Sequence, residues 1–143
     1  MARYATESVI NAPPEKVFAY VADVPRHSEW ASHNLQVTKT SLGPVETDST
    51  FESVSHLFGT QREKLTVIDN SPRKRFAFES TGSLGLVLNA FELAAVDGGT
   101  MLTKSVETVR PSLMARLMAP MIGRTARKSL AADLAGIKKH LES

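Results

Sequence analysis

The sequence has no cysteine among its 143 residues. This absence excludes disulfides, thiolate nucleophiles and zinc sites built on cysteine. Long apolar runs are also missing, since none approaches the ~20 residues that a membrane-spanning helix needs. The N-terminal segment MARYATESV lacks the apolar centre of a signal peptide. We therefore expect a cytoplasmic protein without stable membrane insertion.

Motifs of common catalytic and cofactor sites are absent as well. The sequence has no P-loop, no Rossmann fingerprint and no Gly-x-Ser-x-Gly elbow. His27 and His33 are six residues apart, and no carboxylate stands at a recognisable ligand spacing from them. We expect these two histidines to be exposed in a loop and His56 to point outward. The sequence predicts no metal site and no cofactor.

Charge is nearly balanced, with a formal net charge of +2. Positive residues concentrate in Pro72–Arg75 and again between Arg110 and Lys139. Such clusters can bind nucleic acid or anionic lipid, but a solvated turn and the wet face of a helix explain them equally simply. We favour the solvated faces and expect no nucleic-acid partner. The length and an apolar fraction of 42% are typical of one folded domain over residues 1–143.

The residue patterns predict an α+β protein. Alternation over residues 2–11 indicates a first strand, and two short helices follow, one after Pro13 and one within RHSEWASHN (26–34). Turns with Gly or Pro separate the later strands and leave no room for crossover helices, so neighbouring strands should pair antiparallel. The further candidate strands are Leu35–Ser41, Thr50–Phe58, Gln61–Asp69, Arg75–Thr81, Leu86–Val96 and Thr100–Val109.

Residues Ser112–Ser143 read as a helix that Pro120 kinks or restarts. Its apolar stripe changes in size along the helix. The first part has small residues, Gly123 and Ala126 among them, and the second part is bulky: Leu130, Leu134, Ile137 and Leu141. We expect the bulky end to seal against a curved sheet and the small end to leave space beneath it. Gly123 fits close packing and room for a ligand equally well.

Three stretches carry a family resemblance: VINAPPEKVFAYVADVPRHSEW (Val9–Trp30), VIDNSPRKRFAFES (Val67–Ser80) and FELAAVDGGTMLTKSVE (Phe91–Glu107). Together they resemble the START-like helix-grip (SRPBCC) superfamily, and within it the polyketide cyclase/dehydrase branch. The resemblance implies a seven-stranded curved antiparallel sheet wrapped on a long C-terminal helix, with two short helices between strands 1 and 2. Because this fold hosts binders, transporters, cyclases and regulators, it implies no single reaction.

Lys104 stands on the apolar face of the last predicted strand. A two-residue Gly-Gly loop at 98–99 would pair Leu93 with Lys104 and leave the ammonium facing inward. An unpaired buried ammonium is unfavourable, so three arrangements stay open: an ion pair with Asp133, a side chain that reaches water at the barrel mouth, or a ligand cavity in which Lys104 meets an anionic or carbonyl group. We expect the opposite face to be wet, with Glu92, Met101, Thr103, Ser105 and Glu107.

The other inward-facing positions combine aromatic and polar side chains, which is how small-molecule pockets are usually built. Trp30 suits either a core anchor or, by the resemblance, the pocket mouth. Met114, Met118 and Met121 suit a pocket lining, a surface patch for a partner or membrane, or ordinary core packing. The candidate ligand-binding residues are Thr6, Ser8, Trp30, Phe51, Ser53, Phe78, Asn89, Phe91, Lys104, Val106 and Met121.

Three functions remain open. The first is binding of a hydrophobic or amphipathic small molecule, lipid-, polyketide- or sterol-like, between sheet and helix. The second is a polyketide cyclase or dehydratase in which Lys104 or an inward hydroxyl orients a carbonyl, although the sequence offers no convincing acid–base pair and leaves the catalytic residues unknown. The third is a regulatory or toxin–antitoxin-type module that acts through the basic helix face. A monomer and a homodimer fit equally well.

Overall fold

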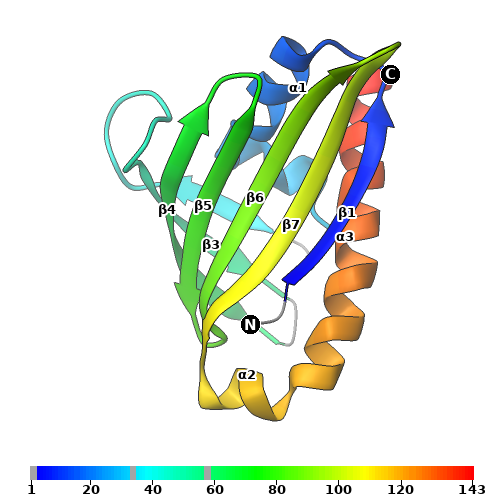
Figure 1. Cartoon of the computed structure of the whole chain (residues 1–143). Helices are drawn as coiled ribbons and strands as arrows, with labels where there is room; N and C mark the ends of the chain where they lie inside the picture. The colour runs from blue at the N-terminus through cyan, green and yellow to red at the C-terminus, as the bar shows by residue number, and fades with distance from the viewer. Residues whose placement is uncertain (1–2, 33–34, 57–58) are drawn as a thin grey trace.

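The computed structural model describes residues 3–32, 35–56 and 59–143. Within them the chain forms a seven-stranded antiparallel sheet in the order β1-β7-β6-β5-β4-β3-β2. The sheet curves around the long C-terminal helix α3 (Figure 1), which confirms the helix-grip prediction. The strands are β1 Arg3–Ile10, β2 Gln36–Lys39, β3 Thr50–Ser55, β4 Gln61–Ser71, β5 Arg75–Gly82, β6 Gly85–Val96 and β7 Gly99–Pro111.

The helices follow the proline signals in the sequence. Two short helices lie between β1 and β2, as predicted, and both begin at or just before a proline. Pro120 restarts the C-terminal helix: α2 ends at Leu117, and α3 begins at Ala119 with Pro120 in its first turn. The helices are α1 Pro14–Val21, the 3₁₀ helix η1 Val24–Glu29, α2 Leu113–Leu117 and α3 Ala119–Glu142.

The hydrophobic core fills the end of the sheet that α1, η1 and the second half of α3 cover. Phe51, Phe76 and Phe91 project from β3, β5 and β6 and are fully buried. Leu134 and Ile137 of α3 belong to the same cluster. In Figure 1 this end is the one with α1, and α2 lies at the opposite end of the sheet. The core therefore occupies only part of the space between sheet and helix.

The β6–β7 register differs from the prediction by two residues. Val96 pairs with Gly99, so the loop is Asp97-Gly98, with Gly98 at φ +84°. Gly99 enters the strand because its Cα lies against the carbonyl oxygen of Ile10, where a side chain would collide. Lys104 consequently pairs with Phe91 instead of Leu93. A shift of two preserves the faces, because side chains alternate with period two.

The outer face of β7 is less wet than predicted. Ser105 is buried, and Met101, Thr103 and Glu107 are partly covered, whereas Glu92 of β6 is exposed. Ser105 lies opposite Ala90 on one side and Ala5 on the other. Its small side chain is covered because longer neighbours flank this row of small residues. The expectation of a wet face is therefore wrong at Ser105.

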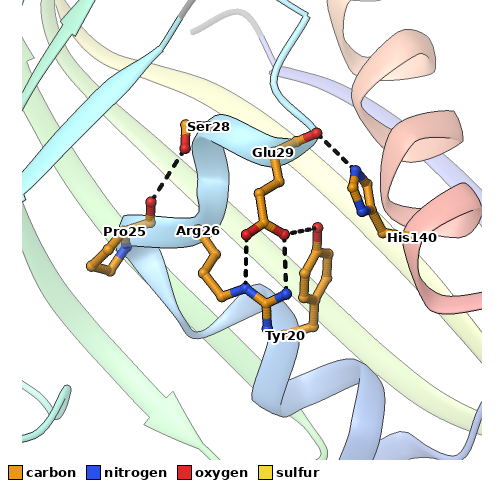
Figure 2. A network of polar contacts seen from close by, with 6 residues as sticks. All are labelled: Tyr20, Pro25, Arg26, Ser28, Glu29 and His140. Carbon is orange, nitrogen blue, oxygen red and sulfur yellow. Dashed lines mark hydrogen bonds and ion pairs between the residues drawn. The ribbon is translucent and has the colours of Figure 1, made fainter.

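The C-terminal end of α3 is fixed to η1 by a polar network (Figure 2). The guanidinium of Arg26 donates to both carboxylate oxygens of Glu29, at 3.0 and 3.1 Å, and Tyr20 Oη donates to Glu29 Oε1 at 3.1 Å. His140 of α3 donates from Nε2 to the backbone oxygen of Glu29 at 3.0 Å. Burial and the adjacent Glu29 raise the pKa of Tyr20 to about 12, so the phenol stays a donor.

A second set of contacts fixes the same end of α3 to the end of β1. Lys138 Nζ donates to the backbone oxygen of Val9 at 2.8 Å and to Glu142 Oε2 at 2.7 Å. Glu142 Oε2 also accepts from the backbone N–H of Asn11 at 2.8 Å. The last turns of α3 are thus fastened on two sides.

Candidate ligand-binding site

A cavity of about 170 Å³ lies beneath the first half of α3. Ala126 and Ile122 form its roof, and Leu130 closes it toward the core. This arrangement confirms the expectation from the sizes of the stripe residues: bulky side chains seal one end and small ones leave space at the other. The apolar part of the lining is Leu84, Val87, Val106, Ala115, Ile122, Ala126 and Leu130.

A second chamber of about 90 Å³ adjoins the cavity on the side of η1. Its own walls are mainly His27, Trp30, Leu35, Leu65 and Phe78. The two spaces adjoin because the same five polar side chains border both. We call this set the polar junction: Glu63, Ser80, Asn89, Lys104 and Asp133.

Lys104 and Asp133 form a buried ion pair at the polar junction. Lys104 Nζ lies 3.5 Å from Asp133 Oδ2, and the two residues are only 6% and 3% exposed. Ser32 donates its backbone N–H to Asp133 Oδ1 at 2.8 Å. Burial lowers the pKa of Lys104, and the adjacent Asp133 opposes that shift. Of the three arrangements left open for Lys104, the pair with Asp133 is confirmed and the side chain that reaches water is wrong.

The ammonium of Lys104 also lies near two aromatic rings. Its Nζ is 5.5 Å from the ring centroid of Trp30 and 5.5 Å from that of Phe91. These distances suit cation–π attraction, which is stronger in a desolvated site. The side chain therefore has an anionic partner and an aromatic surround while it still borders both spaces.

Glu63 faces the same junction from β4, and the sequence analysis missed it. Burial raises the pKa of Glu63, and a hydrogen bond with the Ser80 side chain partly offsets the shift. Asn89 Nδ2 donates to Ser80 Oγ at 3.4 Å. The signal was available in the alternation, because buried Leu65 and Val67 place Glu63 on the inner face two residues earlier.

His27 is buried, so the expectation of an exposed loop histidine is wrong. It lies three residues after Val24 in η1, and i, i+3 positions of a 3₁₀ helix share a face. Its Nε2 lies 2.7 Å from the Val21 carbonyl oxygen, which can only accept. Burial lowers the pKa of His27 to about 4, so the neutral ring carries its proton on Nε2. His56 is exposed as expected, and His33 lies outside the described residues.

Trp30 serves as a core anchor and also as a wall of the second chamber. Its ring centroid is 4.7 Å from that of His27 and 5.8 Å from that of Phe91. Among the described residues its buried Nε1–H finds no hydrogen-bond partner. An unsatisfied buried donor costs about 1–3 kcal/mol. Trp30, which borders the second chamber, thus carries an unpaired donor.

All the predicted binding residues except Met121 fall into three groups. Asn89, Lys104 and Val106 border the main cavity, and Trp30, Ser53 and Phe78 border the second chamber, with Asn89 and Lys104 common to both. Phe51 and Phe91 are buried in the hydrophobic core. Thr6 and Ser8 are half-buried on β1, opposite Lys104 and Leu102 of β7, and neither is among the described residues that border the two spaces.

Met121 lies away from the predicted pocket. Its side chain is exposed, because nine residues at about 100° each place it on the side of α3 opposite Leu130. Gly123, by contrast, faces inward, and of its two explanations close packing holds: a Cβ there would lie 2.6 Å from Tyr4 Oη. The small side chain that leaves room for a ligand is therefore Ala126 and not Gly123.

A family model described as "Polyketide cyclase / dehydrase and lipid transport" matches residues 1–142. The chain belongs to this family. Its resemblance to the helix-grip superfamily is thereby confirmed, and the family supports a role in hydrophobic ligand binding or in cyclisation. No curated protein matches the chain.

Solved structures share the fold of this polyketide cyclase/dehydrase family member at low sequence identity. Protein CV1439 from Chromobacterium violaceum is 12% identical, with a TM-score of 0.79 over 100% of this chain and 99% of that one. TTHA0849 from Thermus thermophilus is 14% identical, with a TM-score of 0.78 over 98% and 97%. The di-domain ARO/CYC StfQ from the steffimycin biosynthetic pathway is 12% identical, with a TM-score of 0.77 over 98% of this chain and 50% of that chain.

Proposed function

We propose that the protein binds an amphipathic small molecule between the sheet and α3. The observation that carries this proposal is the apolar cavity beneath Ala126, which ends at the polar junction. An engineered cavity of about 150 Å³ can hold benzene. A cavity of about 170 Å³ therefore suits one ring or a short acyl segment, and the remainder of a larger ligand would extend into the adjoining second chamber.

The polar junction favours a neutral oxygen-bearing group over an anion. Lys104 is already paired with Asp133, and a carboxylate ligand would also face Glu63. The raised pKa of Glu63 indicates that this environment disfavours negative charge. A hydroxyl or ketone oxygen can accept from the amide of Asn89 or the indole of Trp30, and a hydroxyl can donate to Glu63. We infer that an alcohol, phenol or ketone is the preferred polar end.

The family description supports this function, since it names lipid transport beside polyketide chemistry. The neighbour StfQ, an ARO/CYC protein of a biosynthetic pathway, supports a ligand of polyketide type. The size of the cavity also disfavours a sterol among the possible ligands, because a rigid sterol would require the cavity walls to move.

Fluorescence of Trp30, the only tryptophan, tests the proposal directly. We expect octan-1-ol to change its emission saturably, and octanoate, with the same chain and an anionic end, to bind at least about tenfold more weakly. Ala126→Leu should abolish octanol binding because the added side chain fills the cavity. Ala132→Leu is the matched control, since Ala132 is exposed on the same helix. Equal binding by the two variants would contradict the proposal, and so would stronger binding of octanoate.

A cyclase- or dehydratase-type reaction is a second candidate, favoured by Glu63. A carboxyl group with a raised pKa and an ammonium border the same cavity, which supplies the acid–base pair that the sequence did not reveal. With a poly-β-ketone substrate, Glu63→Gln should abolish turnover and retain octanol binding, because the amide oxygen of glutamine can still accept from the hydroxyl. Unchanged turnover in Glu63→Gln and in Lys104→Met would exclude both residues from the chemistry.

A further inference from the structure

The turn from α2 into α3 exposes a cluster of large apolar side chains. Leu113 and Leu117 are 73% and 77% exposed, and Met114 and Met121 are exposed beside them. We call residues 113–121 the α2–α3 elbow. It lies at the end of the molecule away from α1 (Figure 1). The other exposed large apolar residues of the described chain come from separate segments: Val9, Leu42, Ile68 and Val96.

The elbow and the residues that flank it carry only positive charge. Residues 110–132 include five basic side chains and no Asp or Glu. Because the whole chain has a net charge of only +2, the remainder is net negative, and the positive charge gathers in the elbow and the residues that flank it. The basic residues are all exposed: Arg110, Arg116, Arg124, Arg127 and Lys128.

Apolar and basic side chains share one side of α3. At about 100° per residue, Met121, Arg124 and Lys128 fall within an arc of about 60° that faces away from the sheet. Arg127 is rotated out of that arc, and its guanidinium carbon lies 5.1 Å from the ring centroid of Tyr4. The outer surface of the elbow therefore combines insertable apolar groups with cations on adjoining turns.

We propose that the α2–α3 elbow docks on an anionic lipid bilayer. The exposed Leu and Met side chains enter the boundary between headgroups and acyl chains, and the adjoining cations contact lipid phosphates. Peripheral binding draws on both terms, since apolar burial and attraction to anionic lipid add. The contact is with one face of the bilayer, because no helix of the described chain is long and apolar enough to cross a membrane.

A bilayer fits this surface better than a protein or a nucleic acid does. Stable protein interfaces bury about 800 Å² on each partner and are rich in aromatic residues. The elbow is a protruding tip of four aliphatic side chains, and residues 110–132 contain no aromatic residue. A nucleic acid would neutralise the cations but leave the leucines in water. A deformable anionic surface satisfies both groups at once.

The elbow also borders a cleft that adjoins the main cavity. A cleft of about 150 Å³ runs between Tyr4 and the elbow residues Ala115, Arg116 and Ala119. It shares Thr108, Ala115 and Ile122 with the main cavity. A docked elbow would thus bring the cleft to the membrane surface. The docking proposal itself does not depend on whether the cavity holds a ligand.

Co-sedimentation with vesicles tests the proposal. We expect the protein to bind vesicles of phosphatidylcholine with phosphatidylglycerol at least about tenfold more tightly than vesicles of phosphatidylcholine alone, and added salt to weaken binding. Leu117→Glu should reduce binding to background. Arg124→Gln and Lys128→Gln should each weaken it about fivefold, the factor for one basic residue near an anionic surface.

Two control variants match these changes at other places. Leu42→Glu alters a side chain that is 97% exposed outside the elbow, and Lys139→Gln removes an exposed charge at the far end of α3; binding should stay at the wild-type level in both. Binding that is absent, or lost equally in the controls, overturns the proposal. A dimer in analytical ultracentrifugation that Leu117→Glu dissociates also overturns it, since the elbow would then be a self-association surface. Octanol binding should be retained in Leu117→Glu. A loss of vesicle binding in this variant then reflects the elbow and not damage to the cavity.

Discussion

The two halves of α3 differ in what they pack against, although they belong to one continuous helix. The second half buries Leu134 and Ile137 in the core, and Lys138 and His140 fasten its end to neighbouring backbone. The first half presents Ala126 to a cavity and exposes Met121 on its outer side. The difference teaches that one half can supply stability while the other stays free to enclose a ligand or meet another surface.

Asp133 stands at the boundary between the halves, and its loss should have the largest effect. Asp133→Ala leaves the Lys104 ammonium buried without a carboxylate. Breaking a buried pair in this way costs about 3–5 kcal/mol. We expect the free energy of unfolding, measured with urea at neutral pH, to fall by about this amount.

The double variant Lys104→Met/Asp133→Leu is the control for that prediction. Replacing both charges with apolar side chains should recover most of the lost stability, because such pairs contribute little net free energy over apolar substitutes. A loss below about 1 kcal/mol in Asp133→Ala would show that Asp133 is not what compensates the buried ammonium.

Truncation of one isoleucine in each half compares them directly. Ile137→Ala should lower the unfolding free energy by about 2–5 kcal/mol, because the side chain is fully buried in a packed core. Ile122→Ala should cost about 1 kcal/mol or less, since Ile122 is partly exposed and already borders empty space. Equal losses in urea unfolding would contradict the division of the helix.

Acid should lower the free energy of unfolding through His27, which is buried at the end of the molecule that holds the core, and by a smaller amount. Its pKa is about 4 in the folded protein against 6.5 for the free group, so the unfolded chain binds more protons between these values. The contribution of His27 is complete above pH 6.5 and is lost as pH falls toward 4. The difference corresponds to about 3 kcal/mol.

Urea unfolding of the wild type and of His27→Gln at pH 7 and pH 4.5 isolates this contribution, because only the wild type should lose it in acid. If His27→Gln lost as much stability in acid as the wild type does, another group would be responsible.

Glu63 has the opposite pH dependence: because its pKa is raised, its contribution to stability falls as pH rises. Glu63→Gln should therefore be more stable than the wild type at neutral pH and similar to it in acid.

The sequence predicts most of the fold because alternation and turn residues leave few arrangements open. The hairpin at 97–99 shows the limit of this reasoning. The segment Asp-Gly-Gly permits two different two-residue loops, and the contact of Gly99 with Ile10 decides between them. The inward position of Lys104 was nevertheless predicted correctly, because the two registers differ by two residues and keep the same faces.

The candidate site could be predicted only in part. The pairing of Lys104 with Asp133 was one of three alternatives, and the structure supplied the distance that decides it. Glu63 escapes prediction because its strand begins with polar residues that mask the alternation. His27 escapes it because its burial depends on the i, i+3 spacing of a 3₁₀ helix. Met121 was placed in the pocket because size and flexibility say nothing about helical phase. The errors at Glu63 and Met121 concern the direction of a side chain within a correctly predicted element, whereas His27 lies in η1 and not in the expected loop.

The lone indole N–H of Trp30 has a consequence for selectivity. A bound hydrocarbon would leave this donor without an acceptor, whereas a ligand with an oxygen at hydrogen-bonding distance would supply one. The difference of about 1–3 kcal/mol corresponds to roughly 5- to 150-fold in affinity. The unpaired donor is a property of the chain itself and is present before any guest arrives.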